Sequence, residues 1–115
     1  MKRDILLFVE DILGSIINIE NFSKGISEEK FIGDELRKSA IIRQIEIIGE
    51  AVKNIPESFR KKYPNIEWKK IAGTRDIIIH AYFGVDYEKV WEVVKKDIPK
   101  LKKEIQEIIK KEKSL

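Results

Sequence analysis

The chain has 115 residues, of which 43% are hydrophobic and 37% charged, with a formal net charge of +3 at pH 7. This length suits one domain with one modest core, so we expect a single domain over residues 1–115. The absence of cysteine excludes disulfides and thiolate metal sites. The apolar run 5–9 is interrupted by Glu10 and Asp11, which is too soon for a signal or membrane-spanning segment. We therefore expect a cytoplasmic protein with no membrane partner.

The charge is divided unevenly along the chain. Residues 1–57 carry 8 basic and 11 acidic side chains, a net charge of −3, whereas residues 58–115 carry 15 and 9, a net charge of +6. A basic half is compatible with a polyanionic partner such as RNA. A lysine-rich, solvent-exposed helix gives the same count, so both interpretations stay open at this point.

The first half of the chain has the spacing of two long helices. Apolar residues three and four apart predict the first, from about residue 5 to residue 19. Ser27 is a plausible N-cap for a short turn through Phe31. The second helix is predicted from Asp34 to Pro56. Its expected buried stripe is Leu36, Ile41, Ile45, Ile48, Val52 and Ile55.

The segment 56–66 is a turn-rich connection with a basic cluster at residues 60–62. Helical spacing then resumes and predicts a third helix over residues 66–82, with Gly84 as its stop. The isoleucines at 77–79 also suit a buried strand. We predict a helix because the sequence shows no partner strand for them to pair with.

The last part of the chain predicts two more helical stretches. Asp86 is a natural N-cap, and Val90, Trp91, Val93 and Val94 carry a helix to Asp97, where Pro99 is expected to break or kink it. A final amphipathic helix has Leu101, Ile105, Ile108 and Ile109 on its apolar face. The sequence therefore predicts an all-α, up-and-down bundle of four to five helices.

The segment 68–82 contains the residues best suited to chemistry: Arg75, the only histidine, His80, and Tyr82. A histidine can take the proton from a ribose 2′-hydroxyl or return one to the leaving oxygen. An arginine can hold a phosphate and stabilise charge that develops on it. This route needs neither a metal nor another cofactor, and the sequence has no acidic cluster with metal-ligand spacing.

Structural explanations exist for each of these residues. His80 can be a satisfied core residue paired with Asp76, and Tyr82 can be plain core packing. The charged face that contains Glu46 and Glu50 can be a solvated set of ion pairs. On a straight helix Arg75 and His80 would lie about 140° apart. A shared site therefore requires a helix that loosens near His80, or two subunits in a homodimer with a basic cleft along its seam.

At these residues the chain resembles the HEPN superfamily, and within it the HepT toxins that pair with MNT-type nucleotidyltransferase antitoxins. The family motif, Arg-x4-His-x-Tyr, is matched by Arg75, His80 and Tyr82. The segments 43–51, 66–75 and 85–91 also resemble the family's pattern, with order and spacing kept over essentially the whole chain.

The resemblance implies a HEPN-like homodimeric bundle that acts as the toxin of a toxin–antitoxin pair. It would be a metal-independent RNA endonuclease with Arg75 and His80 as catalytic residues. The cognate antitoxin would transfer AMP from ATP to Tyr82 and thereby block cleavage. A separate hypothesis is that Asp76, Glu46 and Glu50 orient the arginine and the histidine; ion-pair packing at the interface is the alternative. The alternatives are a non-catalytic, nucleotide-binding module that docks a nucleotidyltransferase, and a plain helical scaffold dimer.

Overall fold

The computed structural model describes residues 2–80 and 84–115, and the side chains of all of these except 2–4 and 80. The elements, in chain order, are α1 (Lys2–Ser23), α2 (Glu28–Ile32), α3 (Glu35–Asn54), α4 (Glu57–Arg60), α5 (Trp68–Ala72), α6 (Thr74–Ile78), β1 (Ile79–His80), β2 (Gly84–Val85), α7 (Tyr87–Glu92), the π-helical turn η1 (Val93–Asp97) and α8 (Ile98–Lys113).

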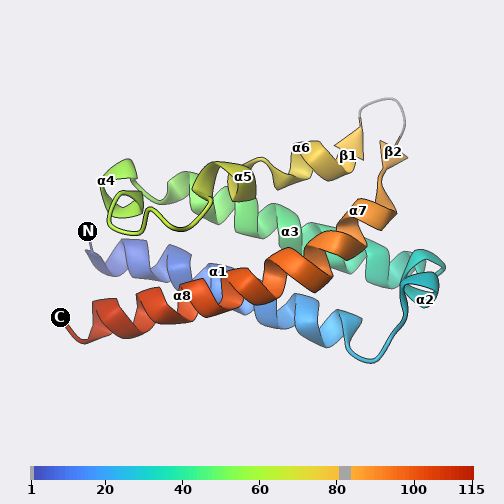
Figure 1. The fold of residues 1–115 in the computed structure, drawn as a ribbon, viewed down its shortest axis with the longest axis horizontal. Coiled ribbons are helices and arrows are strands. Elements are labelled where there is room, and N and C mark those ends of the chain that lie inside the picture. Colours follow the sequence, from blue (N-terminus) through green and yellow to red (C-terminus); the bar gives the residue numbers. More distant parts are fainter. Residues whose placement is uncertain (1, 81–83) are drawn as a thin grey trace.

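The fold is helical apart from one short hairpin. Three long rods, α1, α3 and the continuous run α7–η1–α8, lie roughly side by side along the long axis (Figure 1). The short elements α4, α5, α6 and the hairpin follow one another along α3. None of the helices in the described part of the chain combines the length and apolarity needed to cross a membrane.

The core lies between the three long rods and confirms most of the predicted stripes. On α1, Ile12, Ile16 and Ile19 are fully buried, and on α8, Ile105 and Ile108 face them. The expectation that Leu36 belongs to the stripe of α3 is wrong, because its side chain is 82% exposed. Leu36 stands five residues before Ile41, and five residues turn an α-helix by about 140° away from the buried face.

The helix starts predicted at Ser27, Asp34 and Asp86 are confirmed. Each side chain accepts a hydrogen bond from the backbone N–H three residues later, over 3.2, 3.0 and 3.0 Å respectively. These bonds satisfy N–H groups that have no partner within the helix. At Asp34 the backbone N–H and the guanidinium of Arg37 together lower the pKa of the carboxyl.

The single helix predicted over residues 66–82 is wrong. Gly73 separates α5 from α6, and α6 ends at Ile78. The next two residues form β1, which pairs antiparallel with β2 through Ile79 with Val85 and His80 with Gly84. The partner strand that seemed missing thus follows a few residues later. Gly84 does not stop a helix; its φ of +80° places it in the left-handed region that glycine adopts without strain.

At Pro99 the sequence predicted a break or a kink. The break is wrong, since α7, η1 and α8 follow one another without a gap from Tyr87 to Lys113. Pro99 lies in the first turn of α8 and is preceded by the π-helical turn Val93–Asp97. A proline cannot donate to the carbonyl one turn earlier, and its ring crowds that carbonyl. We attribute the wider turn to this mismatch, which a single π turn relieves locally.

Candidate active site

Arg75 lies on α6 and is fixed by a side chain of α3. Its Nε donates a hydrogen bond to Oε2 of Glu46 over 2.8 Å, while the arginine side chain keeps 55% of its surface exposed. The hydrogen bond with Glu46, and the charge of that carboxylate, raise the pKa of Arg75 further above its ordinary value. The result is a permanent cation, held from one side and open to solvent on the other.

Gly49 allows the segment that carries Arg75 to lie close to α3. A Cβ atom at this position would lie 3.4 Å from the carbonyl oxygen of Ala72 and 3.7 Å from that of Ile71. A methyl group at this position would touch the end of α5, and a side chain larger than alanine would push it away from α3. Gly49 follows Glu46 by three residues, so the close approach occurs about one helical turn from the contact with Arg75. A glycine inside an otherwise regular helical pattern was the sequence signal for this packing.

The hairpin that follows α6 has both of its ends fixed. At one end, the side chain of Ile78 is fully buried in the core. At the other, the backbone N–H of Asp86 donates to the carbonyl of Ile78 over 2.7 Å. Between these points, the backbone of His80 pairs with Gly84. The side chain of His80 and the whole of Tyr82 lie outside the described residues, so the burial predictions for both remain predictions.

The helical-wheel argument about Arg75 and His80 assumed one straight helix. Because α6 ends at Ile78, two residues before His80, the angle of an ideal helix does not apply to this pair. Of the two alternatives, a helix that loosens near His80 or a site built from two subunits, the backbone matches the first. The geometric reason for a site shared between two subunits therefore disappears.

The three acidic residues expected behind the site are placed differently. Glu46 contacts Arg75 directly. Asp76 is exposed, and its charge makes only a minor contribution to the raised pKa of Arg75. Glu50 is exposed, and within residues 2–80 and 84–115 no hydrogen bond or ion pair joins its side chain to Arg75. The described residues also contain no group of three or more His, Cys, Asp and Glu side chains arranged to hold a metal ion.

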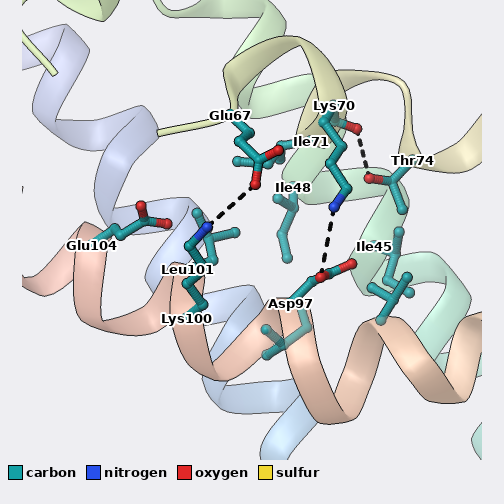
Figure 2. Close-up of a pocket in the computed structure, with 12 residues that line it drawn as sticks. Ile45, Ile48, Glu67, Lys70, Ile71, Thr74, Asp97, Lys100, Leu101 and Glu104 are labelled. Carbon is teal, nitrogen blue, oxygen red and sulfur yellow. Dashed lines mark hydrogen bonds and ion pairs between the residues drawn. The ribbon is translucent and has the colours of Figure 1, made fainter. Parts of the chain in front are cut away.

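A small pocket lies behind the same segment, between α3, α5 and the helix η1–α8 (Figure 2). Its walls are apolar, with Ile45, Ile48 and Leu101 among them. Two ion pairs cross its mouth. Lys70 of α5 pairs with Asp97 of η1 at 3.9 Å, and Glu67, the N-cap of α5, pairs with Lys100 of α8 at 3.3 Å. With room for only about 50 Å³, the pocket is far smaller than a typical ligand site. It is a packing feature that braces α5.

Comparison with known proteins identifies the family. The model of the HepT-like ribonuclease family matches residues 12–108. Two Methanocaldococcus jannaschii proteins, each named "Putative RNase", align with this chain over 109 residues, which are 95% of its length. The first is 53% identical and is covered over 94% of its own length; the second is 52% identical and is covered over 90%. A Thermococcus cleftensis protein named "Probable ribonuclease HepT" is 46% identical over 110 residues, which are 96% of this chain and 100% of the relative.

No solved structure matches the chain significantly. The family match and these relatives cover nearly the whole chain, including α3, α6 and the hairpin. The chain belongs to the HepT-like ribonuclease family.

Proposed function

We propose that this protein is an RNA endonuclease and the toxin of a toxin–antitoxin pair, with Arg75 and His80 as its catalytic residues. Membership of the HepT-like ribonuclease family supports the reaction class. One observation carries the assignment of residues: the guanidinium of Arg75 is exposed and is held by Glu46. Arg75 precedes the only histidine of the sequence by five residues. A fixed, half-exposed cation and a histidine five residues later in the chain are suitable groups for cleaving a phosphodiester.

The proposed reaction needs no metal. The 2′-oxygen of the ribose attacks the neighbouring phosphorus while its proton passes to a base, and the bond from phosphorus to the 5′-oxygen breaks. The leaving 5′-oxygen takes up a proton, so the products are a 2′,3′-cyclic phosphate and a 5′-hydroxyl. His80 supplies or accepts one of these protons. Arg75 binds the phosphate oxygens and stabilises the charge that grows on them.

The test is cleavage of RNA in the presence of EDTA by the wild type and by two variants, Arg75→Ala and His80→Ala. We expect each variant to lose on the order of 100- to 1000-fold in rate, the size of effect found when a transition-state donor is removed. Lys110→Ala, an exposed change on α8, is the control and should cleave normally. A substrate with a 2′-deoxyribose at the scissile position should resist cleavage. Equal cleavage by all four proteins, or by none, would sink the assignment.

We also propose that Tyr82 is the site of control. It follows His80 by two residues, so an AMP group on its hydroxyl would put a bulky anion where the RNA phosphate must bind. The expected partner is a cognate MNT-type nucleotidyltransferase that uses ATP. Mass spectrometry after incubation with that enzyme and ATP should show added AMP on the wild type and none on Tyr82→Phe. AMP on another residue would contradict this assignment.

The homodimer implied by the resemblance belongs to the same proposal, and mixing two dead variants shows where the site lies. If one site takes Arg75 from one protomer and His80 from its partner, a heterodimer of Arg75→Ala and His80→Ala regains one intact site. If both residues act within one protomer, every protomer in the mixture is defective and the mixture stays inactive. Because the hairpin removes the angular constraint of a straight helix, we expect the mixture to stay inactive.

A further inference from the structure

A second and much larger hollow lies between α4 and α5. It is an open groove of about 760 Å³. Its lining includes four basic residues and two acidic ones: Arg60, Lys61, Lys69, Lys70, Glu57 and Glu67. The first two belong to the basic cluster that the sequence places at residues 60–62, and nothing in the proposed reaction uses them.

Two of these cations are available to a ligand. Lys61 keeps 75% of its side chain exposed, and its only ion pair among the described residues is a loose one with Glu57, at 3.9 Å. Lys69 is exposed and has no ion pair or hydrogen-bonded side-chain partner within the part of the chain that the structure describes. Both ammonium groups can exchange water for a phosphate oxygen at little cost, because neither must break a strong contact.

The other charges of the groove are already occupied. The guanidinium of Arg60 donates to the backbone carbonyls of Val52 and Ile55, so it adds positive charge but also holds the end of α3. Lys70 pairs with Asp97 of η1, and Glu67 pairs with Lys100 of α8 (Figure 2). The groove therefore keeps an excess of positive charge, with Lys61 and Lys69 as its free contacts.

The groove and Arg75 belong to one stretch of the chain. In Figure 1, α4, α5 and α6 follow one another along α3, and only Gly73 separates α5 from α6. Lys69 lies on α5 and precedes Arg75, on α6, by six residues. Both elements pack on α3, so one bound RNA strand can meet Arg75 with one phosphate and the groove with others.

We propose that this groove binds the phosphate backbone of single-stranded RNA outside the cleavage site, with Lys61 and Lys69 as the contacts. The inference rests on the proposed ribonuclease function and adds to it a second binding site for the same substrate. Contacts of lysine with phosphates are independent of sequence, so the groove sets the affinity and the path of the RNA rather than the choice of base. An acidic protein surface is the competing occupant, and the test below separates the two.

The test measures binding, without cleavage, of a fluorescent 2′-O-methyl RNA oligonucleotide to the full-length protein from about 50 mM to about 200 mM salt. The double variant Lys61→Gln/Lys69→Gln is compared with Lys103→Gln/Lys110→Gln, which removes the same charge from exposed positions on α8. Each phosphate contact on a single strand contributes about 0.7 to the salt slope, so the groove variant should lower the slope by about 1.4. Its affinity at the lowest salt should fall on the order of tenfold, and that of the control should stay near the wild type.

Two outcomes overturn the proposal. The first is that the two double variants have the same affinity and salt slope, which is also the result expected if the groove binds an acidic protein. The second is that the wild type does not bind the oligonucleotide. Cleavage of ordinary RNA keeps this result separate from the proposed function. If the groove is a binding site for the substrate, the groove variant raises KM and leaves kcat unchanged. If the wild type binds through the groove but does not cleave, the ribonuclease assignment fails while the groove remains a site for RNA.

Discussion

The three long rods and the segment 68–85 differ in the length of their elements and in what stabilises them. The helices α1, α3 and α8 have 22, 20 and 16 residues, and each buries a continuous apolar stripe. The elements from α5 to β2 have two to five residues. Elements that short are not stable by themselves, so they depend on contacts with the rods. The rods determine whether the protein folds, and the segment 68–85 determines where Arg75 is held.

The largest expected effect tests how firmly the two regions are joined. Ile78 is fully buried, whereas its neighbour Ile77 is 43% exposed. Ile78→Ala should lower the free energy of unfolding by about 2–5 kcal/mol, because it leaves a cavity in a packed core. Ile77→Ala should change it by less than about 0.5 kcal/mol. Urea unfolding measures both. Similar losses in the two variants would mean that the segment is not anchored through Ile78.

Glu46 provides the next test, because its contact with Arg75 joins α3 to α6. Glu46→Gln keeps an oxygen acceptor but removes the charge, and a neutral hydrogen bond is about 1 kcal/mol weaker than a charged one. If Arg75 is catalytic, kcat/KM should fall about fivefold, with stability nearly unchanged. Glu50→Gln on the same helix is the matched control and should retain full activity. A rise in activity with Glu46→Gln would show instead that Glu46 restrains Arg75.

A smaller effect is expected at the other end of the molecule. There the hydroxyl of Tyr63 donates to the buried carboxylate of Glu112, which also binds Lys62 at 2.9 Å. Burial, together with this hydrogen bond, raises the pKa of Tyr63 from 10.0 to about 12. The stabilising form is the protonated one, so its contribution is present below about pH 10 and disappears as the pH rises toward about 12.

The free energy of unfolding should therefore fall more steeply between about pH 10 and about pH 12 in the wild type than in Tyr63→Phe. Activity should not depend on this group, because it lies away from Arg75. Unfolding by urea at several pH values measures the two slopes. Parallel slopes would show that the hydroxyl of Tyr63 titrates alike in the folded and unfolded chains.

The smallest expected effect compares two glycines of the long rods, of which only Gly49 faces the segment 68–85. Gly14 is exposed inside α1, and a Cβ atom there would have no neighbour within 4 Å. Gly14→Ala should raise the free energy of unfolding by roughly 0.5–1 kcal/mol, since alanine favours the helix. Gly49→Ala should gain less, because its Cβ would contact the carbonyl of Ala72 at 3.4 Å. Equal gains would mean that the approach of α5 to α3 is looser than described.

The same contrast explains how far the sequence alone could predict this structure. The long helices were predictable because their stripes repeat over many turns, and their starts because Ser27, Asp34 and Asp86 are typical N-caps. The hairpin was missed because two-residue strands show no periodicity. Helical spacing on both sides of Gly73 also concealed the break between α5 and α6.

For the candidate site, the motif identified the residues but not their surroundings. Glu46, Glu50 and Asp76 were equal candidates for a contact with Arg75, because spacing along the chain does not distinguish them. Only the packing of α6 on α3 selects Glu46, and Gly49 lets α5, the helix before α6, lie close to the same rod. The basic cluster at residues 60–62 was visible, but the groove beside it depends on how the connection folds back.

The bond between the Asp86 N–H and the Ile78 carbonyl has a consequence for how the family can diversify. It joins the end of α6 to the N-cap of α7, so the helices themselves hold the two ends of the paired strands together. Once two ends are held in place, a longer connection between them costs little, because doubling the length of a loop adds only about 0.6 kcal/mol. Relatives with insertions after β1 can therefore keep the same arrangement of helices.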